Sequence, residues 1–184
     1  MRIIAGVARG MTLVAPRGKN TRPTSDRVRS AIFSILGERV VGATVADLFA
    51  GSGGLGLEAA SRGARRVVFV ENDKRALVAL ERNVAEFRRR APVGLEIFRE
   101  DVFRFLRRGE RFDVVLADPP YGETAQRLVT MPVATEWLVL ESAMHDPCMP
   151  APVWRVERDA VYGDTRVLVL RCCARKCEPP SDSK

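Results

Sequence analysis

Short apolar runs alternate with helical patterns through the middle of this 184-residue chain. Strands that alternate with helices form βαβ units, and such units build a parallel sheet covered by helices. The alternation therefore predicts an α/β fold. The apolar runs that predict strands lie within residues 45–49, 65–73, 93–101, 111–121 and 135–142, and the helical patterns lie within 55–61, 74–90 and 102–109.

Both ends of the chain add elements to this pattern. Residues 153–173 form two strand patterns joined by Gly163-Asp164, a two-residue hairpin signal, which predicts an antiparallel pair and hence a mixed sheet. Residues 1–16 alternate like a small β-hairpin, and a helix is expected at 25–36 with a cap at Ser25 or Asp26.

Three regions follow from these patterns. We expect a basic hairpin and loop extension at 1–24, one compact domain at 25–176 and a disordered tail at 177–184. Hydrophobic residues make up 46% of the chain, which is enough for a real core. One site in one compact domain makes a monomer the simplest expectation.

Composition narrows the possible location and cofactors. No run approaches the roughly 18 apolar residues of a membrane helix, and the N-terminus has no signal-peptide pattern, so a cytoplasmic protein without a membrane partner is expected. Four cysteines and one histidine show no zinc spacing, so we expect no metal and reduced thiols.

Positive charge concentrates near the N-terminus. The net charge is +7, and residues 1–29 hold seven Arg or Lys against one acid, Asp26. A basic arm on a nearly neutral body is typical of nucleic-acid binders, although charge alone also fits a solvated face. The candidate nucleic-acid contacts in this region are Arg2, Arg9, Arg17, Lys19, Arg22, Thr24 and Arg27.

A glycine-rich loop follows the first predicted strand of the domain. Residues 51–56 read GSGGLG, and Glu71 ends the next strand 20 residues after Gly51. Glycines let the backbone approach a ligand closely, and an acid at that spacing can hold ribose hydroxyls. This layout occurs with both NAD and S-adenosylmethionine, and the loop alone does not choose between them. Asp101 follows the third strand and can accept from an adenine amino group, cap the next helix, or do both.

The fourth strand ends in Asp118-Pro119-Pro120-Tyr121. The prolines resist helix and strand, so the chain turns here in an extended, rigid form. A carboxylate, proline carbonyls and an aromatic ring then form one receptor for a planar ring that bears an amino group. Acceptors on both amino protons favour methyl transfer to that nitrogen, which selects S-adenosylmethionine over NAD.

The segments "DLFAGSGGLGLEAASRGA", "VFVEND" and "LADPPYG" resemble Rossmann-like class I methyltransferases that act on amino groups. The N-terminal "RIIAGVARGMTLVAP" and "RPTSDRVRSAIFSIL" resemble the bacterial 16S ribosomal RNA guanine-N2 methyltransferases, the RsmD-like family. The resemblance implies a seven-stranded sheet, S-adenosylmethionine, and a guanine of 16S rRNA in a small ribosomal subunit as substrate. It also implies that the candidate nucleic-acid contacts of the N-terminal region bind RNA. It implies a flipped guanine held by Asp118, Pro119, Pro120 and Tyr121, and a cofactor held by Asp47, Phe49, Gly51, Ser52, Gly53, Glu71, Asn72, Asp101, Val102 and Asp118.

Two other activities remain open. A DNA adenine or cytosine amino-methyltransferase uses the same Asp-Pro-Pro-Tyr motif, although 184 residues leave no room for a separate target-recognition domain. An RNA-binding assembly factor with an idle site is the alternative outside the enzymes. Only 13 residues, 122–134, separate the motif from the fifth strand, so we expect a shortened helix there.

Overall fold

A computed structural model of the chain contains a seven-stranded mixed sheet, which confirms the predicted α/β class. The structure describes residues 1–16, 25–120, 122–146 and 148–173. The strands are ordered β3-β2-β1-β4-β5-β7-β6. Their bounds are β1 Thr44–Leu48, β2 Arg66–Val70, β3 Gly94–Phe98, β4 Phe112–Ala117, β5 Thr135–Ala143, β6 Trp154–Tyr162 and β7 Thr165–Cys172.

The sheet reverses its direction of growth between β1 and β4. From β1 the chain winds outward to β2 and β3, and it then returns to place β4 on the other side of β1. The first five strands are parallel, so their carboxyl ends meet at one edge. Ligands in open α/β sheets bind outside such a switch point, which makes the β1/β4 edge the place to look for a site.

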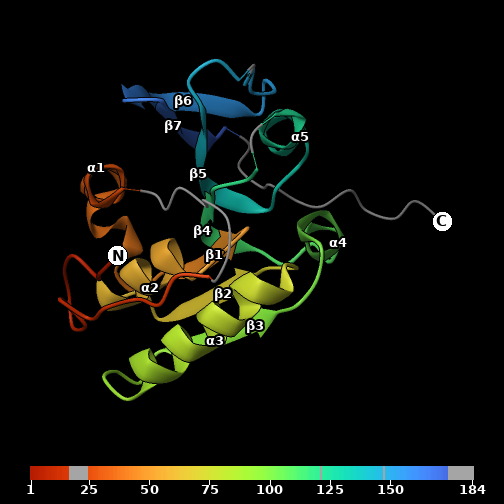
Figure 1. The fold of residues 1–184 in the computed structure, drawn as a ribbon. Coiled ribbons are helices and arrows are strands. Elements are labelled where there is room, and N and C mark those ends of the chain that lie inside the picture. The colour runs from red at the N-terminus through yellow and green to blue at the C-terminus, as the bar shows by residue number, and fades with distance from the viewer. Residues whose placement is uncertain (17–24, 121, 147, 174–184) are drawn as a thin grey trace.

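Helices cover both faces of the sheet (Figure 1). Apolar side chains of α1, α2 and α3 pack on one face, and those of α4 and α5 pack on the other. Each helix presents an apolar stripe to the strands, as amphipathic helices do. The bounds are α1 Asp26–Leu36, α2 Gly54–Ser61, α3 Lys74–Arg88, α4 Val102–Leu106 and α5 Glu123–Thr130, with a short 3₁₀ helix η1 at Gly37–Val40.

Local chemistry sets the ends of these helices. The Ser25 hydroxyl accepts from the Val28 N–H at the start of α1, and Gly37 ends this helix with a φ of 54°. The cap at Ser25 was predicted, because Ser favours the N-cap, and Gly is the residue that adopts a positive φ after a helix most readily. The α5 helix has eight residues, which confirms the shortened crossover between β4 and β5.

The N-terminal segment is part of the core. It folds back on itself through an antiparallel bridge between Arg2 and Thr12, so the expected hairpin is present as a single bridge. Ile3, Met11 and Leu13 are almost fully buried against the α1–α3 side. A separate role for residues 1–24 stays a prediction.

Polar side chains of α2 hold this segment to the body of the molecule. The buried Glu58 carboxylate accepts from the N–H groups of Ile4 and Ala5 at 2.8 and 3.1 Å. The Ser61 hydroxyl accepts from the Ala8 N–H at 2.9 Å and donates to the Ala5 carbonyl at 2.5 Å. The backbone of the N-terminal segment therefore finds its partners on a helix surface instead of in a sheet.

Arg29, counted above with the basic N-terminal residues, is buried. Its side chain is fully shielded, and one nitrogen donates to the Asp26 carboxylate at 2.8 Å and to the Arg2 carbonyl at 2.7 Å. Burial lowers the pKa of this guanidinium, while Asp26 and Glu58 oppose the shift. Arg29 therefore joins α1 to the N-terminal segment and adds no charge to the surface.

The C-terminal strands form the predicted hairpin. Tyr162 pairs with Thr165 across Gly163-Asp164, and Gly163 has a φ of 63°. Cys148 and Cys173 are free, but Cys172 is in a disulfide, so the expectation of reduced thiols is wrong for Cys172. Spacing alone does not decide pairing. Within the described ranges, no helix is long and apolar enough to cross a bilayer.

Candidate active site

Four loops meet at the carboxyl edge of the parallel strands. They follow β1, β2, β3 and β4, and they carry the glycines, Glu71, Asp101 and Asp118 in that order. Because β1 and β4 are neighbours, the glycine loop lies beside the start of the Asp-Pro-Pro segment. The fold thus brings the predicted site residues of four segments to one edge.

Backbone strain marks the glycine loop. Gly51 and Gly53 have φ values of 56° and 83°, and Phe49 is the one described non-glycine residue with a positive φ, at 58°. Gly53 caps α2, which begins at Gly54. A left-handed non-glycine residue costs free energy and persists where surrounding structure fixes it, often at a functional site. The loop leads directly into the positive end of the α2 dipole.

Glu71 ties this loop to the next strand. One carboxylate oxygen accepts from the Gly51 N–H at 2.8 Å, and the other accepts from the N–H groups of Asn72 and Asp73, each at 2.8 Å. The side chain is 9% exposed. Three backbone amides therefore use most of its acceptor capacity, and the carboxylate shapes the loop whatever else it binds.

Asp47 of β1 holds the start of α2, the helix that follows the glycine loop. It is buried, and its carboxylate accepts from the Gly56 N–H of α2 at 2.7 Å. Burial raises the pKa of Asp47 well above its ordinary value, the bond from Gly56 opposes this, and the nearby charges of Asp118 and Glu71 add to it. Direct contact between Asp47 and a cofactor stays a prediction.

Sequence reasoning missed Asn83 of α3. Its amide nitrogen donates to the carbonyls of Ser52 and Val14 at 2.9 and 3.0 Å, and its oxygen accepts from the Val14 N–H at 2.8 Å. The side chain is 2% exposed. Asn83 thus joins the glycine loop to the N-terminal segment. The available signal was an amide on the apolar stripe of α3, between Leu80 and Val84.

Asp101 caps α4, which confirms one of its two predicted roles. Its carboxylate accepts from the Arg104 N–H at 2.9 Å, and the residue is exposed. The next residues are apolar and buried: Val102 lies in the core, and the Phe103 ring meets the Phe49 ring edge-on at 6.3 Å. The end of β1 and the start of α4 therefore share an aromatic contact at the site. The adenine contact stays a prediction.

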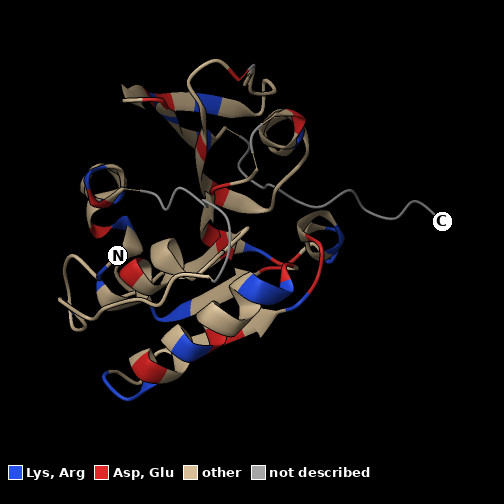
Figure 2. Ribbon diagram, in the orientation of Figure 1, with Lys and Arg blue, Asp and Glu red and all other residues tan. Residues whose placement is uncertain are grey.

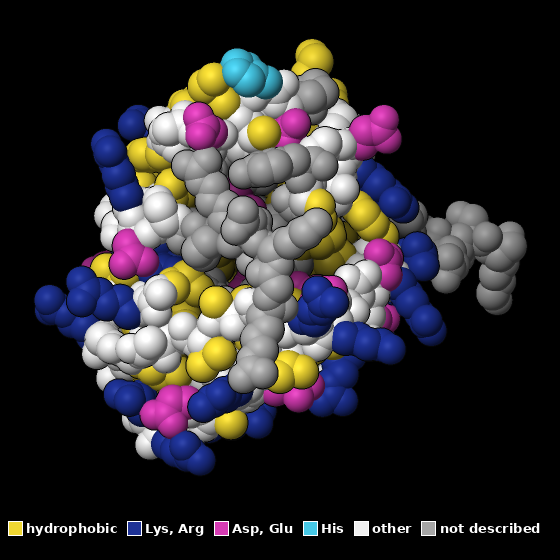
Figure 3. All heavy atoms as spheres, in the orientation of Figure 1, with side chains coloured by type: hydrophobic (Ala, Val, Ile, Leu, Met, Phe, Trp, Pro, Cys, Tyr) yellow, Lys and Arg dark blue, Asp and Glu magenta, His cyan; other side chains and the backbone are white. Residues whose placement is uncertain are grey.

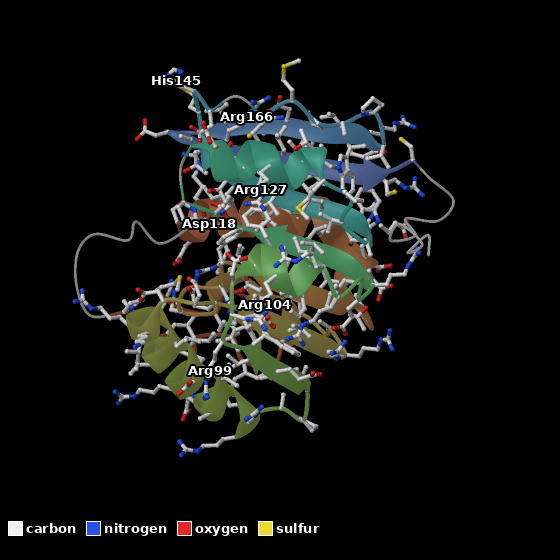
Figure 4. The ribbon with its side chains drawn as sticks, turned by 90° about the vertical axis from the view of Figure 1, so that its right-hand side faces the viewer. Arg99, Arg104, Asp118, Arg127, His145 and Arg166 are labelled. Atoms are coloured by element: carbon white, nitrogen blue, oxygen red, sulfur yellow. The ribbon has the colours of Figure 1, made fainter. Side chains whose placement is uncertain are left out.

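Asp118 lies directly beyond β4 and is half-buried (Figure 4). Pro119 is buried and Pro120 is exposed, so the segment leaves the sheet at once. The Gly122 N–H donates to the Asp146 carboxylate at 3.3 Å, and the same oxygen accepts from the Ala143 N–H at 3.1 Å. The end of the motif is thereby fastened to the end of β5. Tyr121 lies outside the described residues.

The predicted RNA-binding residues divide into two groups. Arg2, Arg9 and Arg27 are exposed on the side of α1 and α2. Arg17, Lys19, Arg22 and Thr24 lie outside the described residues. Basic residues are not confined to this region: blue positions also lie on α3 and α4 (Figure 2), and dark-blue side chains border both flanks of the face in Figure 3.

Several acids lie near the site, which raises the question of a metal ion. Among residues 1–16, 25–120, 122–146 and 148–173, no group of three or more His, Cys, Asp or Glu side chains is placed to hold one. Asp47 and Glu71 instead accept from backbone amides. The acids of this edge act in the protein as hydrogen-bond acceptors.

Comparison with known proteins gives concordant matches. The model of the family described as "Conserved hypothetical protein 95" matches residues 1–170. "Putative rRNA methyltransferase YlbH" of Bacillus subtilis is 37% identical, over 93% of this chain and 98% of its own. "Ribosomal RNA small subunit methyltransferase D" of Escherichia coli K12 is 31% identical, over 100% and 94%. A solved structure, "Putative methyltransferase yhhF from Escherichia coli", superimposes with a TM-score of 0.80 at 30% identity, over 94% and 97% of the two chains.

Proposed function

The chain belongs to the RsmD-like methyltransferase family, and from that premise we propose that it methylates the exocyclic N2 amino group of a guanine in 16S ribosomal RNA. The methyl donor is S-adenosylmethionine, the cofactor of class I methyltransferases with this fold. The names of relatives that span nearly the whole chain support an rRNA substrate. The guanine N2 position is the finer part of the proposal, and it rests on the Asp-Pro-Pro-Tyr motif and the family resemblance.

The residues at the sheet edge fit this cofactor. Gly51 and Gly53 have no side chains, so a ligand can approach the backbone at the positive N-terminal end of α2. Binding of the carboxylate of the methionine part of the cofactor is favoured there. Glu71 offers the ribose its remaining acceptor capacity, and Asp101 with the Val102 N–H offers partners to the adenine ring. Bound S-adenosylmethionine supplies an electrophilic methyl group on a sulfonium.

The single observation that carries the proposal is the position of Asp118. It leaves the sheet at the switch point, one strand from the glycine loop, so an acceptor for the target lies next to the expected methyl donor. Asp118 and the Pro119 carbonyl accept the two amino protons, and Tyr121 stacks on the guanine. These acceptors direct the nitrogen lone pair outward and offset the positive charge that grows on nitrogen.

Proximity supplies the rest of the rate. The bases of a stacked helix cannot reach the sheet edge, so the guanine must be unstacked, and the prolines keep its acceptors in a fixed position. The exposed Arg2, Arg9 and Arg27 and the basic residues at 17–24 hold the RNA backbone in this proposal. Residues 1–24 then act as the substrate-binding extension of a domain that spans 25–176.

The location of transferred label tests the proposal. The full-length protein is incubated with methyl-labelled S-adenosylmethionine and one of three substrates: small subunits from cells that lack the modification, naked 16S rRNA, or DNA. The proposal predicts label in 16S rRNA as N2-methylguanosine. Label confined to DNA would support the amino-methyltransferase alternative. RNA binding without transfer, equal in wild type and Asp118→Ala, would support an assembly factor.

A further inference from the structure

Three exposed arginines lie at the carboxyl edge of the sheet, two of them on the face opposite the N-terminal segment. Arg99 follows β3 directly, Arg104 is in α4, and Arg127 begins the second turn of α5. All three are close to the carboxyl edge of the sheet, because α4 and α5 both start there. In Figure 4, which faces α4 and α5, Asp118 lies between the levels of Arg104 and Arg127. We call Arg99, Arg104 and Arg127 the arginine rim.

Arg127 is held in place without an acid. Its guanidinium lies 3.7 Å from the centre of the Phe103 ring, and it makes no ion pair with any described residue. Phe103 is 8% exposed and meets Phe49 at the end of β1. A stacked guanidinium keeps the N–H groups at its edge available, and its planar fork suits phosphate oxygens.

Arg99 and Arg104 are available to an anion for a different reason. Their side chains are 66% and 75% exposed. Arg99 pairs with the exposed Glu81 at 2.8 Å, and Arg104 lies 3.7 Å from Glu100, whose other oxygen pairs with Arg108. Exposed ion pairs contribute little free energy, so a phosphate can replace these partners at small cost.

The rim complements the basic residues on the other face of the sheet. Arg2, Arg9 and Arg27 lie on the α1–α3 side, whereas Arg104 of α4 and Arg127 of α5 lie on the opposite side. Arg99 follows β3 directly and pairs with Glu81 of α3. A base that reaches Asp118 comes from a strand that continues in both directions past the site. The strand therefore meets positive charge before and after the flipped base.

We propose that the arginine rim binds the phosphodiester backbone of the RNA along the carboxyl edge of the sheet, from α5 past α4 to the end of β3. The inference rests on the proposed function, because it takes the substrate to be RNA that enters at Asp118. Each phosphate contact adds about 0.7 to 0.9 to the slope of log affinity against log salt concentration. Three contacts make the slope of the wild type about 2 to 3 units steeper than that of a protein without the rim.

A triple variant, Arg99→Ala with Arg104→Ala and Arg127→Ala, tests the rim. Its matched control replaces Arg65, Arg89 and Arg90, which are exposed and paired with acids, as Arg99 and Arg104 are. These three precede β2 or follow α3, so they lie at the opposite edge of the sheet. The two triples remove the same charge. Affinity for small subunits and for naked 16S rRNA is measured between 50 and 300 mM KCl, together with S-adenosylmethionine affinity and thermal stability.

The rim variant should lose about 2 to 3 units of salt slope and weaken RNA binding on the order of 10-fold or more at 150 mM salt. Its cofactor affinity should stay within about 2-fold of the wild type. The control triple should keep the wild-type slope within about one unit. An unchanged slope in the rim variant, or equal losses in both triples, would overturn the inference.

The same measurements separate this inference from the proposed function. RNA binding is measured without methyl transfer. If the wild type methylates no RNA but its salt slope still depends on the rim, the proposed function is refuted and the inference about the rim is supported. Normal methylation by the wild type, with a rim variant that binds RNA as the wild type does, refutes only the rim.

Discussion

Replacement of Asn83 by alanine should loosen the glycine loop and the N-terminal segment together. The change removes the acceptor of the Val14 N–H at 2.8 Å and the donor to the Val14 and Ser52 carbonyls at 3.0 and 2.9 Å. The wild-type amide is 2% exposed, whereas Val14 is 39% exposed, so water reaches the freed groups only in part. The change removes three hydrogen bonds, and each contributes about 1 kcal/mol net, with a larger cost where a backbone group stays unpaired. We expect a loss of about 2 to 4 kcal/mol in the free energy of unfolding.

Ser61→Ala is the matched control. The Ser61 hydroxyl also holds the N-terminal segment, through Ala8 and Ala5, but it does not contact the glycine loop. Both variants should therefore lose stability in urea denaturation, Ser61→Ala by about 1 to 3 kcal/mol. Only Asn83→Ala should bind S-adenosylmethionine more weakly, by about 10-fold, because ordering a freed loop residue costs about 1 to 2 kcal/mol.

Calorimetric titration below the unfolding transition of both variants measures the cofactor affinity. The reasoning fails if Asn83→Ala binds the cofactor as tightly as Ser61→Ala does, or if it loses less than about 1 kcal/mol of stability. The first result would mean that the glycine loop keeps its shape without Asn83. The second would mean that water replaces the lost partners.

Two further changes test the support of the site. The pKa of buried Asp47 is raised, so the folded chain keeps a proton that the unfolded chain loses above about pH 4, and stability falls as the pH rises above that value. Urea denaturation from pH 5 to 8 should therefore show that Asp47→Asn gains stability relative to the wild type. Parallel stability curves for the two proteins would contradict the burial argument. In Gly6→Ala, a Cβ would lie 1.7 Å from the Ser61 carbonyl oxygen at a φ of 82°, whereas the Cβ of Gly10→Ala, at a φ of 81°, would meet nothing within 4 Å. Denaturation should show that Gly10→Ala loses about 1 to 2 kcal/mol in the free energy of unfolding and that Gly6→Ala loses clearly more. Equal losses would mean that the N-terminal segment shifts away from α2.

Much of the fold could be predicted from local sequence patterns. The strands and helices of residues 44–143 were predictable because each apolar run and each helical stripe has its own period. The Gly163-Asp164 turn and the Ser25 cap were predictable for the same reason, since each is set by a few neighbouring residues. The adjacency of β1 and β4 required the fold class as well as the sequence, because no local signal orders strands in a sheet.

The supports of the site were harder to predict. Glu71 was assigned to a ribose, but the structure gives its carboxylate three backbone partners within the protein. Glu58 and Asn83 bind backbone groups 31 to 69 residues away in sequence, and no spacing rule reports contacts of that range. Their signal was a polar side chain on an apolar helix face. A buried polar residue needs a partner, and only the tertiary structure identifies it.

Arg29 illustrates the same limit for charge. The sequence places it among basic residues at the N-terminus, and only its helical spacing from Ile32 and Leu36 distinguishes it from exposed Arg27. Its position on the buried side of α1, beside Asp26, removes it from the surface. Charge counts along a sequence therefore overstate the charge that a nucleic acid can meet.

Single-turnover methyl transfer by Asp118→Ala tests the central claim most directly. Wild type, Asp118→Ala and the control Asp113→Asn are mixed with unmodified small subunits and saturating labelled S-adenosylmethionine, and nucleosides of the 16S rRNA are separated by chromatography. Asp113 lies on the same strand, at the opposite end, and is bonded to Thr44. The account predicts N2-methylguanosine from wild type and Asp113→Asn, and a rate lowered about 100-fold or more in Asp118→Ala with cofactor affinity retained. Label in another nucleoside, or an undiminished rate in Asp118→Ala, would contradict it.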